Sequence, residues 1–402
     1  MTIIGVGDFR IDEEAKNAIN EVLDSGRITE GAKTAEFEET FAEYIGTKYC
    51  IALNSGTSAI IAGLNAVMHH KDFQVKKGSK VITSPVTYIA TSNAISLSGL
   101  KPAYVDVSRN KFSITPESIK EHLEHADDPS EYSLILPVHI MGFPCDMDKI
   151  NKIAKEYGLL TFEDSAQAHG TLYHGKKTGS LSLLSDFSFY VAHNIQAGEL
   201  GAITTDDHEI YRLVKKIKAN GRLCDCPICT RSKGFCPRMK ETNDPDPRFM
   251  HDMIGYNFKT MEFQTALALM QLRKADEILK KRQDNVKYLN EQMIQFEDIL
   301  QLPDFSEDVS YLAYPLVLKE NAEIKRERLC KELEKKGIET RPLFGCIPTQ
   351  QPAYAHLKEK YKDKLTNAEY LGNNAFYVGC HQYLEQEDLD KIISAFREVV
   401  KS

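Results

Sequence analysis

The chain of 402 residues contains no tryptophan, no excess of basic residues and no run of about 18 uninterrupted apolar residues. Because a transmembrane helix needs such a run, we expect no membrane span. The sequence has 50 Lys and Arg against 58 Asp and Glu, a formal net charge of −8, which argues against nucleic acid as the main partner. With 42% hydrophobic and 27% charged residues, a disordered, collagenous or disulfide-scaffold protein is excluded.

The first residues, MTIIGVGDFRIDEEAK, carry acidic side chains where a secretory signal needs a basic segment and then an apolar run. We therefore expect a cytoplasmic location. The nine cysteines are an odd number, and in a reducing compartment they are expected to be thiols or metal ligands rather than disulfides.

Short β-rich runs alternate with helical patterns from about residue 36 to 220, which is typical of an α/β fold. The alternation predicts a mainly parallel sheet with helices on both faces and ligands beyond the carboxyl ends of its strands. We expect a large domain over residues 1–265, with a Cys-rich insertion at about 221–250. Residues 266–402 would supply the rest of a long helix, predicted from about 260 to 293, and a small α+β domain.

Three segments carry polar residues at such strand ends. In ALNSGTSA, residues 52–59, Gly56 and Thr57 could offer backbone amides to a phosphate, or simply form a capped turn. In TFEDSAQAHG, residues 161–170, Asp164 could keep a heteroaromatic nitrogen protonated and Gln167 could bind a phenolate, although helix capping would also explain Asp164. Tyr88 could stack on a cofactor ring or belong to the core.

Together with DFSFYVAHN at 186–194 and GYNFKTMEFQ at 255–264, these segments resemble the sugar aminotransferases that use pyridoxal phosphate on the fold-type I scaffold. The resemblance covers nearly the whole chain. It implies a large domain that binds pyridoxal or pyridoxamine phosphate. It also implies phosphate contacts from Gly56, Thr57 and Ser188, ring stacking by Tyr88, and contacts from Asp164 and Gln167 to the ring nitrogen and oxygen. Asn257 would reach the phosphate of a second subunit, so a homodimer with shared active sites is expected.

One position departs from that family. Where its aminotransferases carry the lysine that forms a Schiff base, this chain has His193, and an imidazole cannot form that imine. Histidine can instead exchange a proton near neutral pH. The replacement resembles that in the family's sugar 3-dehydratases, which use pyridoxamine phosphate and remove the C3 hydroxyl of a nucleotide-linked 4-keto-6-deoxyhexose. The lysine of GYNFK, Lys259, where the aminotransferases usually have arginine, supports the same branch.

A cysteine cluster bears on the kind of dehydratase. Cys224, Cys226, Cys229 and Cys236 have the spacing C-x-C-x2-C-x6-C, compact enough to hold one metal centre. The spacing favours a [2Fe-2S] cluster that receives electrons from a reductase, as in one kind of these dehydratases. A structural zinc remains the alternative, because four thiolates also suit a tetrahedral zinc site.

Three other interpretations stay open: a pyridoxal phosphate-dependent aminotransferase-like protein, a dehydratase with a zinc loop, and a noncatalytic binding protein. Retention of Asp164, Gln167, Ser188 and Asn257 argues against the last one. The sequence predicts neither the nucleotide nor the hexose of the substrate.

Overall fold

A computed structural model describes residues 3–224, 226 and 249–400. The strands of its central sheet are β1 (Tyr49–Leu53), β2 (Lys80–Thr83), β3 (Lys101–Tyr104), β4 (Tyr132–Leu136), β5 (Leu160–Asp164), β8 (Leu184–Ser188) and β9 (Gly201–Thr205). They lie in the order β1-β9-β8-β5-β4-β2-β3. β9 runs antiparallel to both of its neighbours, and the other pairings are parallel. The predicted α/β class with a mainly parallel sheet is confirmed.

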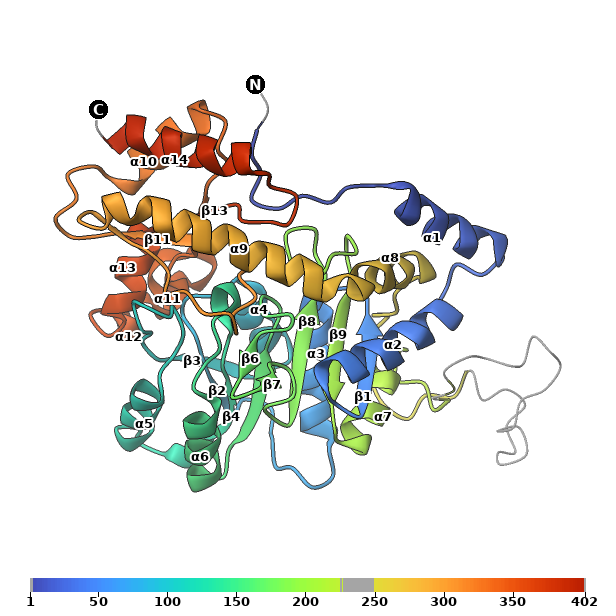
Figure 1. Cartoon of the computed structure of the whole chain (residues 1–402). Helices are drawn as coiled ribbons and strands as arrows, with labels where there is room; N and C mark the ends of the chain where they lie inside the picture. Colours follow the sequence, from blue (N-terminus) through green and yellow to red (C-terminus); the bar gives the residue numbers. More distant parts are fainter. Residues whose placement is uncertain (1–2, 225, 227–248, 401–402) are drawn as a thin grey trace.

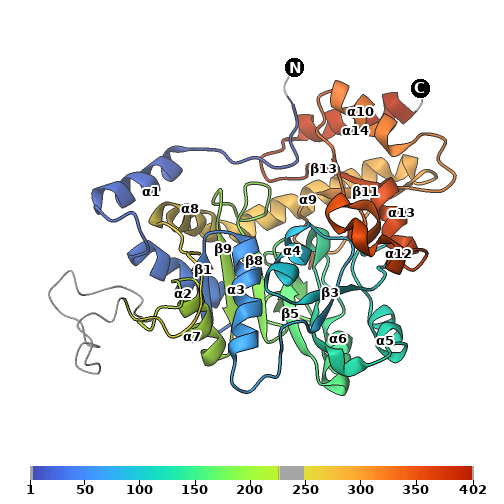
Figure 2. The same ribbon diagram turned by 180° about the vertical axis from the view of Figure 1, so that it is seen from behind.

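Helices cover both faces of this sheet (Figures 1 and 2). α3 (Gly56–His69) and α7 (His208–Ile217) contact β9, while α2 (Ala32–Ile45) contacts β1 and α6 (Met147–Tyr157) contacts β5. Phe37 and Phe41 of α2 pack edge-on against Phe189 and Phe187 of the β8 segment. Because side chains alternate along a strand, Asp186 and Ser188 then face the other side, toward α3. The remaining elements of this half are α1 (Glu13–Asp24), α4 (Ala90–Leu97), α5 (Pro116–Glu124) and the hairpin of β6 (Leu172–Tyr173) and β7 (Lys176–Lys177).

The long helix predicted from about 260 to 293 is two helices, α8 (Glu262–Arg273) and α9 (Ala275–Met293). The backbone leaves helical geometry at Lys274, whose φ and ψ are −106° and 10°. The boundary expected between residues 265 and 266 thus falls inside α8, which packs on α1 and α2 of the large domain.

A smaller antiparallel sheet, in the order β10-β11-β13-β12, forms the C-terminal part. Its strands are β10 (Leu300–Gln301), β11 (Tyr314–Leu318), β12 (Arg341–Pro342) and β13 (Ala375–Val378). The helices are α10 (Arg326–Lys335), α11 (Ile347–Gln350), α12 (Lys358–Tyr361), α13 (Thr366–Asn374) and α14 (Gln386–Val400). Residues near the amino terminus, expected in the large domain, join this part through a bridge between Ile4 and Ile338. Among the described helices, none combines the length and the apolar character that a bilayer crossing requires.

Candidate active site

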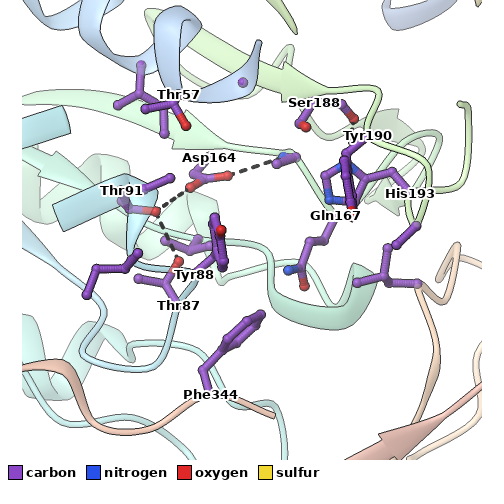
Figure 3. A pocket seen from close by; sticks show the side chains of 18 of the residues that line it. Thr57, Thr87, Tyr88, Thr91, Asp164, Gln167, Ser188, Tyr190, His193 and Phe344 are labelled. Atoms are coloured by element: carbon purple, nitrogen blue, oxygen red, sulfur yellow. Dashed lines mark hydrogen bonds between the residues drawn. The ribbon is translucent and has the colours of Figure 1, made fainter. Parts of the chain in front are cut away.

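A cavity of about 690 Å³ opens between the carboxyl ends of the parallel strands and the C-terminal part (Figure 3). Seven of the eight residues predicted to bind the cofactor or act on it line this cavity: Gly56, Thr57, Tyr88, Asp164, Gln167, Ser188 and His193. They come from loops and strand ends that are far apart in the sequence. The topology of the sheet therefore brings together what the sequence presents as separate motifs.

The first turn of α3 forms one end of the cavity. The hydroxyl of Ser55 caps the helix by accepting a hydrogen bond from the Ser58 amide at 3.1 Å. A Cβ atom on Gly56 would lie 2.6 Å from Cβ of Ser188, so only glycine lets the helix approach β8 this closely. The backbone amides of Gly56 and Thr57 thus lie at a helix N-terminus beside the Ser188 hydroxyl, an arrangement suited to a phosphate dianion.

Asp164, at the end of β5, is a buried carboxylate at the base of the cavity. Its Oδ2 accepts a hydrogen bond from the Thr91 hydroxyl at 2.8 Å, and its Oδ1 accepts one from the Ala166 amide at 3.2 Å. Burial raises the pKa of Asp164, and these two hydrogen bonds act in the opposite direction. A carboxylate in this setting can hold a proton on a ring nitrogen.

A hydrogen bond to its side-chain carbonyl oxygen orients Gln167. Oε1 accepts a hydrogen bond from the Met141 backbone amide at 2.9 Å, which leaves the side-chain NH₂ group as a donor. Since Gln167 lines the cavity, this donor is available to an oxygen on a bound ring. Tyr88, 62% exposed, lies on the loop between β2 and α4 with its ring centroid 6.3 Å from that of Phe344.

His193 lies in the loop between β8 and β9. Its Nδ1 donates to the Ser188 carbonyl oxygen at 2.8 Å, so the neutral ring has its lone pair on Nε2. Burial, the hydrogen bond to Ser188 and the nearby Arg282 guanidinium together bring the pKa of His193 down to about 4: burial and Arg282 lower it, and the hydrogen bond acts in the opposite direction. The imidazole is therefore neutral near pH 7 and able to accept a proton. No lysine is among the described residues that line the cavity.

Three of the other predicted site residues are described but do not line the cavity. Asn257 is exposed and pairs through its backbone with Ala219. Its expected contact belongs to a second subunit, so that role stays a prediction. Cys224 and Cys226 are partly exposed, whereas Cys229 and Cys236 lie outside the described residues. The described residues contain no group of His, Cys, Asp or Glu side chains placed to hold a metal ion, and two of the four cysteines lie outside them, so the predicted metal site stays a prediction.

Asp186 and Thr91 line the cavity, and the sequence analysis did not single them out. Asp186 stands two residues before Ser188 on β8, and side chains two apart on a strand share a face. That alternation would have identified it. Thr91 follows Tyr88 by one helical turn at the start of α4, a weaker signal.

The chain matches the model of the DegT/DnrJ/EryC1/StrS aminotransferase family over residues 9–397. A dTDP-4-dehydro-2,6-dideoxy-D-glucose 3-dehydratase of Saccharopolyspora spinosa is 31% identical, over 97% of this chain and 85% of that protein. A GDP-perosamine synthase of Caulobacter vibrioides is 30% identical, over 99% of this chain and 98% of that protein.

Solved structures resemble the chain over its whole length. A GDP-4-keto-6-deoxymannose-3-dehydratase, in a mutant form with bound GDP-perosamine, has a TM-score of 0.85 and 28% sequence identity, and the match covers 99% of this chain and 100% of that one. The fold-type I scaffold expected from the sequence motifs is therefore confirmed.

Proposed function

The chain belongs to the DegT/DnrJ/EryC1/StrS aminotransferase family, and from this premise we propose that it removes the C3 hydroxyl of a nucleotide-linked 4-keto-6-deoxyhexose with pyridoxamine phosphate. One observation carries the proposal. His193, whose unprotonated ring nitrogen is Nε2, lines a cavity whose described lining residues include no lysine. Aminotransferases hold pyridoxal phosphate through a lysine imine, so histidine at this place favours proton transfer on a noncovalently bound cofactor.

The cavity fits that cofactor. The first turn of α3 and Ser188 suit its phosphate, Asp164 its ring nitrogen and Gln167 its ring oxygen. When bound, pyridoxamine phosphate supplies an amine that condenses with a ketone and a ring that accepts electrons.

The side chains then have distinct tasks. Asp164 would keep the ring nitrogen protonated, because its carboxylate is buried and oriented by Thr91. With its free lone pair on Nε2, His193 would serve as the base for a proton at C4′ of the cofactor and could give that proton to the oxygen of the leaving C3 hydroxyl. Tyr88 lines the cavity and would stack on the ring. The 3-dehydratase names of the relatives support a sugar nucleotide as substrate, with dTDP and GDP both candidates for the nucleotide.

The proposal extends to the cysteine segment. We place a [2Fe-2S] cluster on Cys224, Cys226, Cys229 and Cys236 because of their spacing, with a reductase as electron donor. Zinc is the competing occupant, since four thiolates suit it as well. A homodimer, with Asn257 reaching into the other subunit's site, and a cytoplasmic location complete the proposal.

The test uses protein purified without oxygen and loaded with pyridoxamine phosphate. Given a GDP- or dTDP-linked 4-keto-6-deoxyhexose and a one-electron reductant, it should form the 3-deoxy sugar, detected by mass spectrometry. Formation of an amino sugar that depends on glutamate, with no deoxy product, would contradict the proposal. The His193→Ala variant serves as the control for background chemistry.

A further inference from the structure

A second carboxyl group lies beside Asp164. Asp164 on β5 and Asp186 on β8 are partners in the register of two adjacent parallel strands. Neighbouring strands are about 4.8 Å apart, and partner side chains of a parallel pair lie on the same face. Both residues line the cavity, so the two carboxyl groups lie next to each other at its base.

Asp186 differs from the other buried acids of this sheet in its hydrogen bonding. Its side chain is fully buried, and apart from its own backbone amide neither oxygen has a hydrogen-bond donor among the described residues. Glu163, equally buried on β5, accepts hydrogen bonds from the amides of Gly179 at 3.0 Å and Leu181 at 2.9 Å and from the Ser182 hydroxyl at 3.0 Å. Such donors stabilise an ionised carboxylate, and Asp186 lacks them.

The charges around Asp186 oppose a second negative charge. The ionisable groups that act on it are Asp164 and Glu163, both acids on β5. The imidazole of His139 pairs with Glu163 at 3.0 Å and acts on Asp164, whose ionised form it favours. Its partner on β9 is Ile203, and α3 faces the cavity here with Ile60, so neither supplies a cation. Burial raises the pKa of Asp186 well above its usual range, and Asp164 raises it further. Two adjacent carboxyl groups shielded from water do not both ionise at neutral pH.

We propose that Asp186 is a positioning residue of the cofactor site, which stays protonated and shares its proton with Asp164, so that the pair presents a single negative charge to the ring nitrogen. The effect on the ring nitrogen of the cofactor rests on the proposed function, whereas the proton shared by the two acids is a property of the cofactor-free protein. Through its O–H group Asp186 fixes the orientation of the Asp164 carboxylate. A second ionised acid would instead leave an unbalanced charge at the base of the cavity.

Infrared spectroscopy of the cofactor-free protein tests the protonation. The wild type at neutral pH should show the carbonyl stretch of a protonated carboxylic acid, and this band should disappear in Asp186→Asn. Glu163→Gln is the matched control, because Glu163 is equally buried but accepts hydrogen bonds from three neighbours and pairs with His139, so the band should persist. A wild type and Asp186→Asn without any difference in this band would overturn the proposal.

Binding of pyridoxamine phosphate, measured by calorimetry, tests the positioning. Asp186→Ala removes the donor that orients Asp164 and should weaken binding about threefold to tenfold, and Asp186→Asn, which keeps a neutral donor, should recover most of that loss. Asp164→Asn should weaken binding about tenfold to a hundredfold. Equal losses in Asp186→Asn and Asp164→Asn would overturn the proposal, since Asp186 would then act as an anion. Binding by Asp186→Ala as tight as that of the wild type would overturn it as well. If Asp186→Asn fails to fold, Asp186→Ser replaces it in both measurements. A wild type that binds no pyridoxamine phosphate would refute the proposed function, while the infrared result would still decide the protonation.

Discussion

The carbonyl oxygen of Ser188 accepts a hydrogen bond from Nδ1 of His193, five residues later, at 2.8 Å. The side chain of the same serine lies against Gly56 at the first turn of α3. One residue thus links the end of the cavity suited to a phosphate to the base that would move a proton. The hydrogen bond also fixes the tautomer, because a carbonyl can only accept.

Removing the imidazole should separate binding from proton transfer. We expect His193→Ala to bind pyridoxamine phosphate about as tightly as the wild type, since the cofactor contacts lie on other residues. Exchange of the C4′ proton with deuterated solvent, measured by mass spectrometry, should fall about 10²- to 10⁴-fold. His174→Ala is the control, because His174 is exposed and pairs with Asp148 away from the cavity. Full exchange in His193→Ala would refute the role of the base.

The pH dependence of that exchange should report the low pKa of His193. Because burial lowers this pKa to about 4, the ring stays neutral, and competent as a base, well below neutral pH. The exchange rate should therefore change little between about pH 7.5 and pH 5.5. A histidine with the ordinary pKa of about 6.5 would lose about tenfold at pH 5.5. Circular dichroism at each pH would verify that the protein stays folded. If the exchange rate fell tenfold while the protein stayed folded, the low pKa of His193 would be contradicted.

A lysine at position 193 should restore a covalent link. His193→Lys places an amine in the loop that faces the cavity, so addition of pyridoxal phosphate should produce a visible absorption band that borohydride reduction removes. The His193→Ala variant should show no such band. If His193→Lys also lacked the absorption band, residue 193 would not occupy the position of the family's lysine in space.

How much of this site the sequence predicted depends on how local each feature is. Gly56 and Asp164 were singled out because they lie at or just after the ends of apolar strands, where ligands of parallel sheets bind, and their cofactor roles came from the resemblance to the family. The low pKa of His193 was not predicted, because it arises from burial and from Arg282 on α9, almost ninety residues later in the chain. The break between α8 and α9 at Lys274 was not predicted either, because the apolar pattern of the sequence continues through it. Long-range packing decides both, and no local pattern reports it.

The close approach of α3 to β8 should make Gly56 sensitive to a single methyl group. In Gly56→Ala the added Cβ would lie 2.6 Å from Cβ of Ser188, so helix and strand must separate where the phosphate is expected to bind. We expect about tenfold weaker binding of pyridoxamine phosphate and a stability loss of about 1–3 kcal/mol. Gly63→Ala is the matched control on the same helix, because its Cβ would meet Phe162 at 2.7 Å, outside the cavity. It should lose stability and keep its affinity. Equal affinities in the two variants would contradict the phosphate site.

The last prediction concerns the cysteine segment. Cys226→Ser should remove a soft thiolate and leave three ligands, so iron should be lost or become labile. Pyridoxamine phosphate binding and C4′ proton exchange should persist, because the residues assigned to them line the cavity, apart from Asn257 of the second subunit, and Cys226 is not among them. Formation of the 3-deoxy product, which needs electrons, should fall to background. Cys330→Ser is the control, since Cys330 is a partly buried cysteine of α10, far along the chain from the segment.

Metal analysis of the wild type, purified without oxygen, separates the two occupants of that segment. A [2Fe-2S] cluster predicts a coloured protein with about two irons per chain and a product that forms only with a reductant. A zinc site predicts a colourless protein with about one zinc per chain and turnover without any reductant. Zinc without iron would refute the electron-transfer part of the proposed function. It would leave the dehydration part intact, because His193, Asp164 and the first turn of α3 do not depend on the metal.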